Sequence, residues 1–346
     1  MCTHNGALYL REQLESIAAQ TRLPDELVVC DDASADATRE IVVNFGASSP
    51  FPVSLHANHI ALGSTKNFEK AIALSTGDLI ALSDQDDVWR ADKLAMIEKR
   101  FSENPEIGMV FSDAQIVDEQ LGDTNRRLWV ESGFDEKKRR AIRGGKAFDV
   151  LLPAWWVTGA TMAFEAKFKE LVLPIPSDLP MIHDGWISLM IAAVAEVGMI
   201  DEQLIMYRQH ARQQLGAPTK RDGSVTSKAK LLAKVTAGPR NDSYSDLIRT
   251  LLAINERLEL RGKKERKGTA PIEYRLKHLN ARSNLPVHAF GRLPLVLREL
   301  ITLRYHRFSN GVSSAVRDLL YAPTNSGSRR DAADEASPAS KKSFVG

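Results

Sequence analysis

The sequence predicts an α/β fold, with a mixed, mainly parallel sheet flanked by helices and a basic helical extension at the C-terminal end. Two observations support this prediction. Short β-prone runs alternate with helical patterns between residues 8 and 112, and such alternation is typical of right-handed βαβ units. In addition, two acidic clusters directly follow two of the β-prone runs. Sheets of this class bind ligands beyond the carboxyl ends of their strands.

The individual elements can be placed from the spacing of apolar residues. Helices are expected over residues 8–20, 34–45, 64–75 and 93–101, and strands over residues 28–32, 51–56, 79–83 and 108–112. Beyond residue 112 the alternation loosens. There we expect an exposed charged segment (135–143), strand-like backbone around a tight Gly159 (154–164), a buried helix (187–197) and a strand (204–207).

The start of the chain departs from a regular βαβ array. Residues 1–6 lead directly into the expected helix 8–20, so the sheet is expected to lack the strand that would lie beside residues 28–30. We expect the natural chain to begin upstream by roughly five to ten residues, which is a typical strand length.

Charge divides the 346-residue chain, which is long enough for one large domain or two smaller ones. Residues 1–216 carry 21 Lys and Arg against 32 Asp and Glu, a net charge of −11, whereas residues 217–322 carry 21 against 9, a net charge of +12. We therefore expect a catalytic domain over 1–216, a basic helical region over 217–322 that meets an anionic surface, and a disordered tail over 323–346.

Composition favours a cytoplasmic protein. Cys2 and Cys30 are the two cysteines of the chain, which argues against a disulfide framework and fits a reducing compartment. The longest apolar stretch, residues 187–200, is shorter than a membrane span and contains Glu196, so we expect a buried helix there. No signal-peptide pattern is visible at the start.

The most informative motif is Ser83-Asp84-Gln85-Asp86-Asp87-Val88-Trp89, which follows an apolar run over 79–82. Its three closely spaced carboxylates repel one another, and such clusters usually indicate a bound cation or a perturbed proton. One or two Asp side chains hold Mg²⁺ or Mn²⁺ where a substrate diphosphate completes the coordination. The motif predicts a metal-dependent nucleotide-diphosphate site. The alternative is a solvated acidic turn before a helix. Within the functional interpretation, Asp84 and Asp86 face donor and metal, and Asp87 is expected to cap the turn into Trp89 and the helix beyond.

Three further positions carry candidate functional side chains. Asp31 and Asp32 end a strand, where an Asp either accepts a hydrogen bond from a nucleobase or, like Ser34, caps the next helix. Asp184 precedes an apolar helix, whose N-terminus should keep it ionised and able to take a proton; capping is again the alternative. His210 is a metal ligand, a partner for a leaving phosphate, or a structural histidine.

Five motifs occur in a fixed order that resembles family 2 glycosyltransferases with the GT-A fold, most closely the bacterial rhamnosyltransferase-type members. The resemblance covers about residues 1–215 and extends into the basic C-terminal helices. Each motif is weak alone, but the ordered set is specific. The motifs are Thr3-His4-Asn5-Gly6, the block 31–38, the acidic motif over 83–89, His183-Asp184-Gly185-Trp186 and Tyr207-Arg208-Gln209-His210.

The resemblance implies a role for each matching residue. Asp184 would be the catalytic base of an inverting enzyme. Asp86 would bind the metal most directly, and His210 would join it. Asp31 and Asp32 would meet the nucleotide base and ribose, while the segment containing Arg208 would close over the diphosphate. The donor-binding set would comprise Thr3, Asn5, Asp31, Asp32, Lys66, Asp84 and Arg208.

The chain departs from the family pattern in two respects. The expected lack of a first strand would weaken binding of the nucleotide base. The Gln-x-x-Arg-Trp motif of many synthase-type members is not found, which argues against a processive polysaccharide synthase.

The resemblance implies an inverting, metal-dependent glycosyltransferase of bacterial surface-polysaccharide assembly. Its donor would be a nucleoside-diphosphate sugar, with dTDP-L-rhamnose as the first candidate, and its acceptor a glycan or a lipid-linked molecule. One carboxylate base and one metal suffice for a single displacement. A nucleotidyltransferase is a rival, although no Gly-rich, basic phosphate loop appears near the N-terminus. A non-catalytic nucleotide-sugar-binding protein is another.

The segment 293–308 is expected to form an interfacial helix at the inner face of the cell membrane. Such a helix would bind anionic lipid; the alternative is a helix docked on its own domain or on a second subunit. No nucleic-acid-binding module accompanies the basic charge, so we expect no nucleic-acid partner. The apolar side would contain Val296, Leu297, Leu300, Ile301, Leu303 and Phe308, and the basic remainder Arg298, Arg304, His306 and Arg307.

Overall fold

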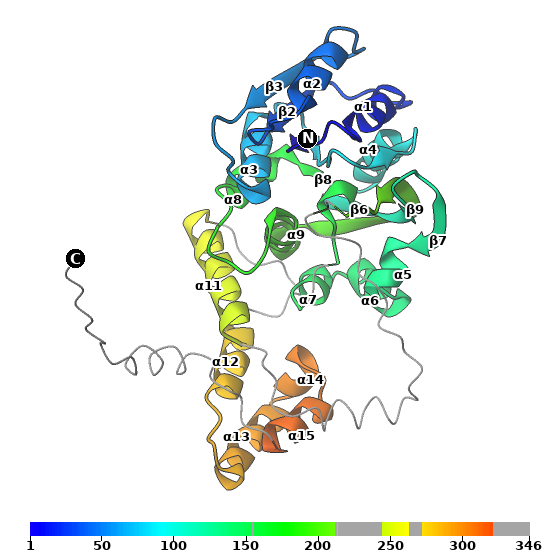
Figure 1. Ribbon diagram of the computed structural model, residues 1–346. Coiled ribbons are helices and arrows are strands. Elements are labelled where there is room, and N and C mark those ends of the chain that lie inside the picture. The colour runs from blue at the N-terminus through cyan, green and yellow to red at the C-terminus, as the bar shows by residue number, and fades with distance from the viewer. Residues whose placement is uncertain (154–155, 212, 214–243, 263–271, 321–346) are drawn as a thin grey trace, which may run out of the picture. The chain divides into compact units, whose positions relative to one another are not determined.

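The computed structural model describes residues 1–153, 156–211, 213, 244–262 and 272–320 (Figure 1). These residues belong to two compact units. The first comprises the described parts of Met1–Gly223 and Ile254–Thr269, and the second those of Ser224–Ala253 and Ala270–Gly346. The tail expected over 323–346 and the first part of the expected basic region lie outside the described residues.

A parallel three-stranded sheet begins the first unit, in the order β1-β2-β3. All five residues of β2 are buried, as is typical of a parallel strand that is covered on both faces. Helices follow each strand and return the chain to the same edge of the sheet. The elements are β1 (Cys2–Thr3), α1 (Leu10–Ala18), β2 (Leu27–Asp31), α2 (Thr38–Gly46), β3 (Val53–Ala57) and α3 (Ser64–Leu74).

The expectation that no strand lies beside residues 28–30 is wrong, because β1 occupies that place. Cys2 lies opposite Cys30 and Thr3 opposite Asp31 in the parallel ladder. The Met1 ammonium donates a hydrogen bond to the Val28 carbonyl at 2.8 Å. Two residues are too few to show a strand pattern in the sequence, but they place Thr3 at the carboxyl end of β2.

The second sheet has six strands, ordered β4-β8-β6-β9-β5 with β7 paired to β6. Only the β6–β9 pair in it is parallel. Two of its strands are longer than expected: β6 continues beyond Ser112, and β9 starts at Glu196 rather than near Leu204. The strands are β4 (Leu79–Ala81), β5 (Val88–Trp89), β6 (Ile107–Val117), β7 (Asp123–Arg127), β8 (Met162–Glu165) and β9 (Glu196–Arg208).

Helices of the first unit cover the second sheet. The most buried of them, α9 (His183–Val194), is apolar on nearly all sides, as expected of a helix inside a core. The Trp186 indole N–H donates to the Val172 carbonyl at 2.8 Å. The other helical segments are α4 (Lys93–Glu103), α5 (Leu128–Ser132), α6 (Glu136–Arg143), α7 (Ala147–Leu151), η1 (Gly159–Thr161), η2 (Ala166–Phe168) and α8 (Lys169–Val172).

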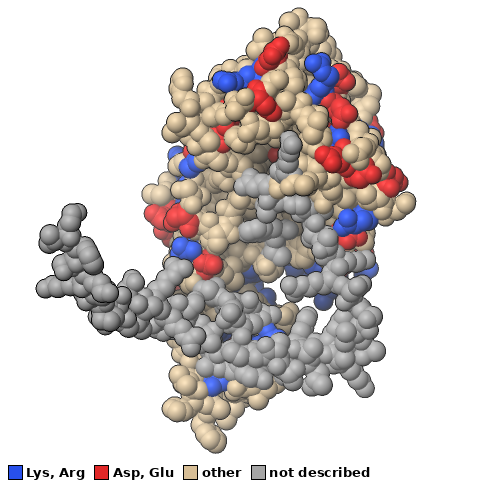
Figure 2. All heavy atoms as spheres, viewed as in Figure 1, with Lys and Arg blue, Asp and Glu red and all other residues tan. Residues whose placement is uncertain are grey.

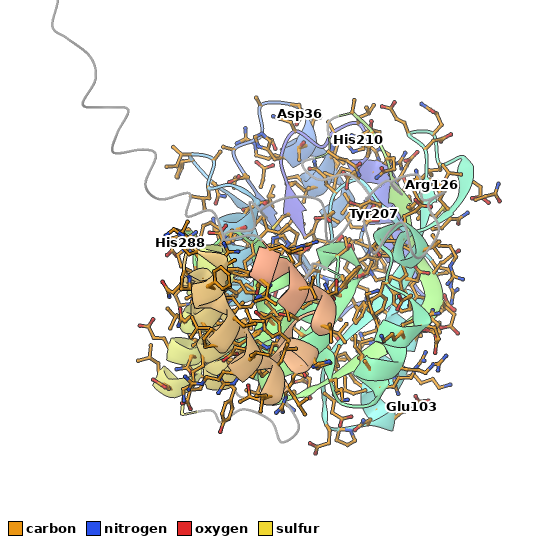
Figure 3. All side chains as sticks on the ribbon, turned by 90° about the horizontal axis from the view of Figure 1, so that it is seen from below. Asp36, Glu103, Arg126, Tyr207, His210 and His288 are labelled. Atoms are coloured by element: carbon orange, nitrogen blue, oxygen red, sulfur yellow. The ribbon has the colours of Figure 1, made fainter. Side chains whose placement is uncertain are left out.

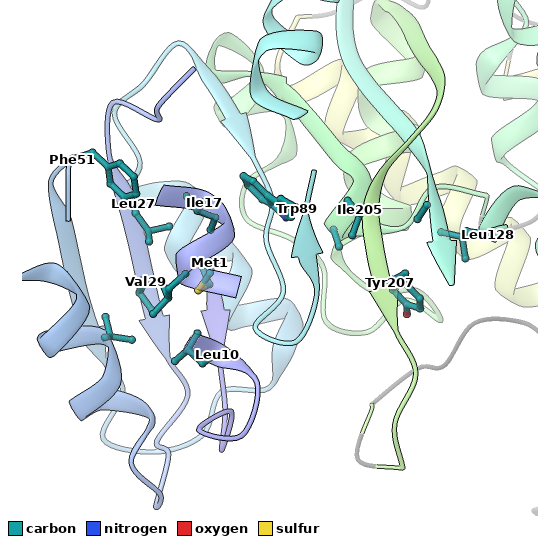
Figure 4. Packing of buried hydrophobic residues seen from close by; sticks show 14 of the residues in the cluster. Met1, Leu10, Ile17, Leu27, Val29, Phe51, Trp89, Leu128, Ile205 and Tyr207 are labelled. Carbon is teal, nitrogen blue, oxygen red and sulfur yellow. The ribbon is translucent and has the colours of Figure 1, made fainter. Parts of the chain in front are cut away.

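One hydrophobic cluster joins the two sheets (Figure 4). Met1, Leu10 and Val29 contribute from the parallel sheet and α1, and Trp89 and Ile205 contribute from β5 and β9. The cluster therefore packs the parallel sheet and α1 against strands β5 and β9 of the second sheet. On the outer surface, Figure 2 shows acidic side chains in several groups on the visible face of this unit, consistent with the acidic N-terminal part.

The second unit is helical, as the sequence predicts for this region. A buried polar network holds it together: Arg282 pairs with Asp318 at 2.6 Å, and the Tyr305 hydroxyl donates to the same carboxylate at 2.7 Å. The helices are α11 (Tyr244–Leu260), whose second half belongs to the first unit, and α12 (Ile272–Ser283), α13 (Ala289–Ile301), α14 (Arg304–Phe308) and α15 (Val312–Leu320).

The expectation of one continuous helix over 293–308 is wrong. Helix α13 ends at Ile301 and α14 begins at Arg304, because Leu303 adopts a left-handed conformation with φ 56°. The expected apolar side is also divided. Val296 is fully buried and Leu300 packs against the core of this unit, whereas Leu297, Ile301 and Leu303 are exposed.

In the ranges that the structure describes, no helix combines the length and apolar character needed to cross a bilayer. Cys2 and Cys30 are both buried free thiols.

Candidate functional site

A cavity of about 510 Å³ opens at the carboxyl ends of β1, β2 and β4. Thr3, Asp32, Asp84, Asp86 and Asp184 all line it, although they are up to 181 positions apart in the sequence (3 to 184). A second cavity, of about 370 Å³, lies at the amino ends of β2 and β4. Because α/β sheets bind their ligands at the carboxyl ends of the strands, the first cavity is the candidate site.

Buried carboxyl groups gather at and beside this cavity. Burial, and then the charges of Asp86 and Asp184, raise the pKa of Asp84 to about 7. Burial also raises the pKa of Asp87 well above its usual value. Its Oδ1 accepts a hydrogen bond from the Arg208 N–H at 3.2 Å, and no described residue donates to its Oδ2. Asp87 therefore anchors the end of β9 rather than capping the adjacent turn.

Asp86 lies beside His210. The Asp86 Oδ2 and His210 Nε2 atoms are 2.9 Å apart, and the histidine ring packs 4.5 Å from the Tyr9 ring, centre to centre. Tyr207 lies within β9 and His210 two residues beyond its end; Figure 3 labels both. The chain just after β9 thus places an imidazole beside the Asp86 carboxylate; Asp86 lines the cavity and His210 does not.

Gln85, between the two aspartates, ties the acidic loop to the start of the chain. Its side-chain carbonyl accepts from the His4 N–H at 2.8 Å, and its amide donates to the His4 carbonyl at 3.0 Å. A Cβ at Gly6 would lie 2.1 Å from the Gln85 Oε1. The glycine is therefore required for this close approach, which fixes the N-terminal loop beside the carboxylates.

Asp31 and Asp32 perform different structural tasks. Asp31 holds the turn after β2 and does not cap α2, which begins at Thr38. It accepts from Thr3 Oγ1 at 2.9 Å, Ser34 Oγ at 2.5 Å and Ser34 N at 3.0 Å, and it does not line the cavity. Asp32 does line the cavity. Its carboxylate accepts from the backbone N–H groups of Leu62 at 2.7 Å and Gly63 at 2.9 Å.

Asp184 lies in the first turn of α9, opposite the acidic loop. Its Oδ1 accepts from the Gly185 N–H at 2.7 Å and its Oδ2 from the Gly159 N–H at 3.2 Å. Burial raises its pKa to about 6, although these two backbone hydrogen bonds act to lower it. The carboxylate is therefore mostly ionised at neutral pH, yet basic enough to accept a proton.

Several cavity residues were not among the sequence candidates. His183 stacks on Phe68 with ring centres 4.0 Å apart, and burial lowers its pKa to about 3, so the imidazole is neutral. The motif around Asp184 points to His183, whereas the positions on α3 and near Gly159 carry no sequence signal, because they face the cavity only after the two sheets pack. The missed residues include Ser64, Asn67, Phe68, Thr158, His183 and Gln213.

Other sequence candidates lie outside the cavity lining. Arg208 is buried, forms an ion pair with Glu12, and donates to the Asp86 carbonyl at 2.8 Å. Lys66 pairs with Glu69 at 2.8 Å. Asn5 accepts from the Ala35 N–H at 2.9 Å, and so supports the loop at the start of α2.

The donor set at the cavity fits a hard divalent cation whose coordination a ligand completes. In the part of the chain that the structure describes, no three His, Cys, Asp or Glu side chains group so as to hold a metal by themselves. Asp86 and His210 form an adjacent pair, and Asp84 adds a carboxylate beside Asp86. One or two carboxylates plus phosphate oxygens are the usual ligands of Mg²⁺.

The α/β fold thus places a carboxylate-lined cavity at its strand ends, which is where sheets of this class bind small molecules. Residues 1–156 match the family described as Glycosyl transferase family 2. The similarity to this family thus covers the two sheets up to Trp156 but less than half of the chain.

Curated relatives include several glycosyltransferases. The Shigella flexneri dTDP-rhamnosyl transferase is 36% identical over 98 residues, 27% of this chain and 34% of that protein. An Escherichia coli UDP-Glc:alpha-D-GlcNAc-diphosphoundecaprenol beta-1,3-glucosyltransferase is 35% identical over 96 residues, 28% of this chain and 37% of that one. Longer alignments, at 26–27% identity, span 57–62% of the relatives' length, so the chain spans less than two thirds of them.

Among solved structures, the mannosyltransferase of Pyrobaculum calidifontis in complex with GDP-Man and Mn²⁺ aligns with a TM-score of 0.46 at 15% identity. The alignment covers 92% of this chain and 84% of that one.

The role of Asp32 in holding the loop before α3 leads to a testable prediction. An Asp32→Asn side chain can accept from only one of the Leu62 and Gly63 amides, and a hydrogen bond to a charged acceptor contributes about 1.5–3 kcal/mol. We expect amide hydrogen exchange at Leu62 or Gly63 to become at least about tenfold faster, while the Ala47 amide, bonded to Val43 in α2, keeps its rate. Unchanged exchange at both loop amides would contradict this assignment.

Proposed function

We propose that the protein is an inverting, metal-dependent glycosyltransferase with a GT-A fold that acts in bacterial surface-polysaccharide assembly. It transfers a sugar from a nucleoside-diphosphate donor to a glycan or lipid-linked acceptor. The observation that carries the proposal is the meeting of Asp84 and Asp86, from the end of β4, with Asp184, from α9, in one cavity. The first two supply an anionic, metal-binding wall and the third a base.

The donor occupies the part of the cavity formed by the strand ends. Its nucleotide binds near Thr3 and Asp32, and its diphosphate lies toward Asp84 and Asp86. Because the diphosphate and the Asp84 and Asp86 carboxylates are all anionic, a cation must lie between them. Asp86, with His210, holds Mg²⁺ or Mn²⁺, which when bound neutralises the charge that develops on the leaving diphosphate.

The remaining donor-binding candidates act indirectly, by holding other residues of the site in place. Asp31 orients Thr3 and the turn into α2, and Asn5 supports the same turn. Arg208, fixed by Glu12 and the Asp86 carbonyl, holds the chain that carries His210. Lys66 braces α3 at the other side of the cavity.

Asp184 removes the proton of the acceptor hydroxyl. The hydroxyl is a poor nucleophile until a base within hydrogen-bond reach takes its proton as the new bond forms. The Gly159 and Gly185 N–H groups hold both carboxylate oxygens in place, so the base needs little reorganisation. Attack from the Asp184 side, with the diphosphate leaving on the other, inverts the configuration at the sugar carbon.

The sugar specificity rests on resemblance. We propose dTDP-L-rhamnose as the first donor to test, since the Shigella flexneri relative that aligns at 36% identity is a dTDP-rhamnosyl transferase. A lipid-linked acceptor is supported by the Escherichia coli relative, whose substrate is a diphosphoundecaprenol.

A donor-hydrolysis assay separates the candidate functions. A panel of nucleotide sugars with Mn²⁺ should give metal-dependent release of nucleoside diphosphate that the Asp86→Ala variant loses. Release of pyrophosphate from a nucleoside triphosphate and a sugar phosphate would instead identify a nucleotidyltransferase. Tight binding of a nucleotide sugar without any turnover would identify a non-catalytic binding protein.

The assigned base yields a pH-dependent prediction. Asp184→Asn should keep donor affinity and folding but transfer about a hundredfold more slowly or worse, the scale of a lost general base. The wild-type kcat should fall as pH decreases through about 6, because protonated Asp184 cannot accept a proton. The variant should lose this acidic limb. Transfer near the wild-type rate in Asp184→Asn would refute the role.

Membrane association belongs to the same proposal. Phe290, Leu293, Leu297 and Ile301 are 93%, 45%, 45% and 81% exposed and lie three or four positions apart, so they share one face of α13. Over the described residues 244–253 and 272–320, Lys and Arg outnumber Asp and Glu by nine to four. We propose that this exposed apolar face inserts into anionic lipid, with the basic charge directing it there.

Vesicle flotation tests the contact. The wild-type protein should float with phosphatidylglycerol-containing vesicles, less with pure phosphatidylcholine, and less at high salt. Phe290→Glu with Ile301→Glu should abolish flotation, whereas Leu252→Glu, at an exposed leucine of α11, should not. A wild-type protein that never floats would refute the proposal. Dimers that the double variant dissociates would then indicate a second subunit on this face.

A further inference from the structure

Lys93 is a charged side chain inside the core behind the candidate site. It is the first residue of α4 and has 0% relative exposure. Burial of an ammonium group is costly unless charge and hydrogen bonds compensate for it. Burial lowers the pKa of Lys93 to about 7, and the charges of Asp87 and Asp84 oppose that shift. The side chain does not line the cavity, so any part it plays in the reaction is indirect.

Two contacts fix the ammonium group. Its Nζ donates a hydrogen bond to the Ala160 carbonyl at 2.8 Å, and it lies 3.7 Å from the centre of the Trp89 ring. Trp89 is the last residue of the acidic motif, and its backbone N–H is held by the Ser16 hydroxyl at 3.0 Å. The cation therefore bridges the acidic motif and the short 3₁₀ segment η1 in which Ala160 lies.

That segment also positions the base. Gly159 directly precedes Ala160, and the Gly159 N–H donates to Asp184 Oδ2. The contacts run from the Trp89 ring, through the Lys93 ammonium and the Ala160 carbonyl, to the Gly159 N–H and Asp184. The Asp87 and Asp84 charges act on the ammonium electrostatically. The other cation beside the acidic motif, Arg208, is already paired with Glu12 and makes no contact with this segment among those described.

We propose that Lys93 is a positioning residue that couples the acidic donor-binding motif to the catalytic base by fixing the Gly159–Ala160 segment. This inference rests on the proposed role of Asp184 as the base. The charge of the acidic motif favours the protonated amine, and the protonated amine makes the stronger, charge-assisted hydrogen bond to the Ala160 carbonyl. The same buried cation offsets part of the carboxylate repulsion from behind the cavity.

The test replaces the ammonium group with an uncharged side chain of similar length. Lys93→Met should fold, because apolar replacements of buried charges are often tolerated, and its donor affinity should stay within about threefold. Its kcat should fall by about tenfold or more, since the base is no longer held. Lys99→Met, at an exposed lysine of the same helix (75% side-chain exposure), should leave kcat unchanged.

Two further readouts distinguish positioning from a general loss of stability. In an Asp184→Asn background, Lys93→Met should lower kcat little further, because both changes disable the same base. Amide exchange at Gly159 should accelerate in Lys93→Met, with or without turnover. Full kcat, additive losses in the double variant, or unchanged Gly159 exchange would overturn the inference. A wild-type protein without transferase activity but with accelerated Gly159 exchange in the variant would refute the proposed function and leave the coupling intact.

Discussion

A cluster of buried carboxyl groups after β4 is the constraint on which the rest of the site depends. The Asp84 and Asp87 carboxylates are withdrawn from water, and burial together with neighbouring carboxylates raises their pKa values. Such a cluster is tolerated only where positive charge or N–H groups oppose it. Lys93 supplies a cation from behind and the Arg208 N–H a donor from the side. The remaining side of the carboxyl cluster faces the cavity, where a metal-bound diphosphate would complete the charge balance.

The sequence predicted what local patterns determine. The alternation of strands and helices, the helical C-terminal region and the two acidic strand ends all follow from short stretches whose periodicity and turn residues act locally. The first strand was missed because β1 contains only two residues. The length of β9 was missed because Asp201 and Glu202 interrupt its apolar pattern. In the folded protein Arg143 pairs with Asp201 at 2.9 Å, a long-range contact that the local pattern does not reveal.

Packing decides what local patterns leave open. Asp31 and Asp32 are equivalent in the sequence, but only the second faces the cavity, because successive residues at a strand end point in opposite directions. Arg208 was expected near the diphosphate, yet its guanidinium pairs with Glu12, 196 positions away. The sequence pattern around Lys93 is typical of an ordinary surface lysine on an amphipathic helix. Its burial results from the approach of η1, which no pattern around residue 93 encodes.

The most direct test of the account is where a metal binds. A crystal of the protein grown with Mn²⁺ and a nucleoside diphosphate should show an anomalous peak at a coordination distance of about 2.0–2.3 Å from an Asp86 carboxylate oxygen, with the diphosphate completing the coordination and Asp184 across the cavity. Manganese and diphosphate bound away from Asp86, or a diphosphate bound in this cavity without any metal at saturating Mn²⁺, would contradict the account.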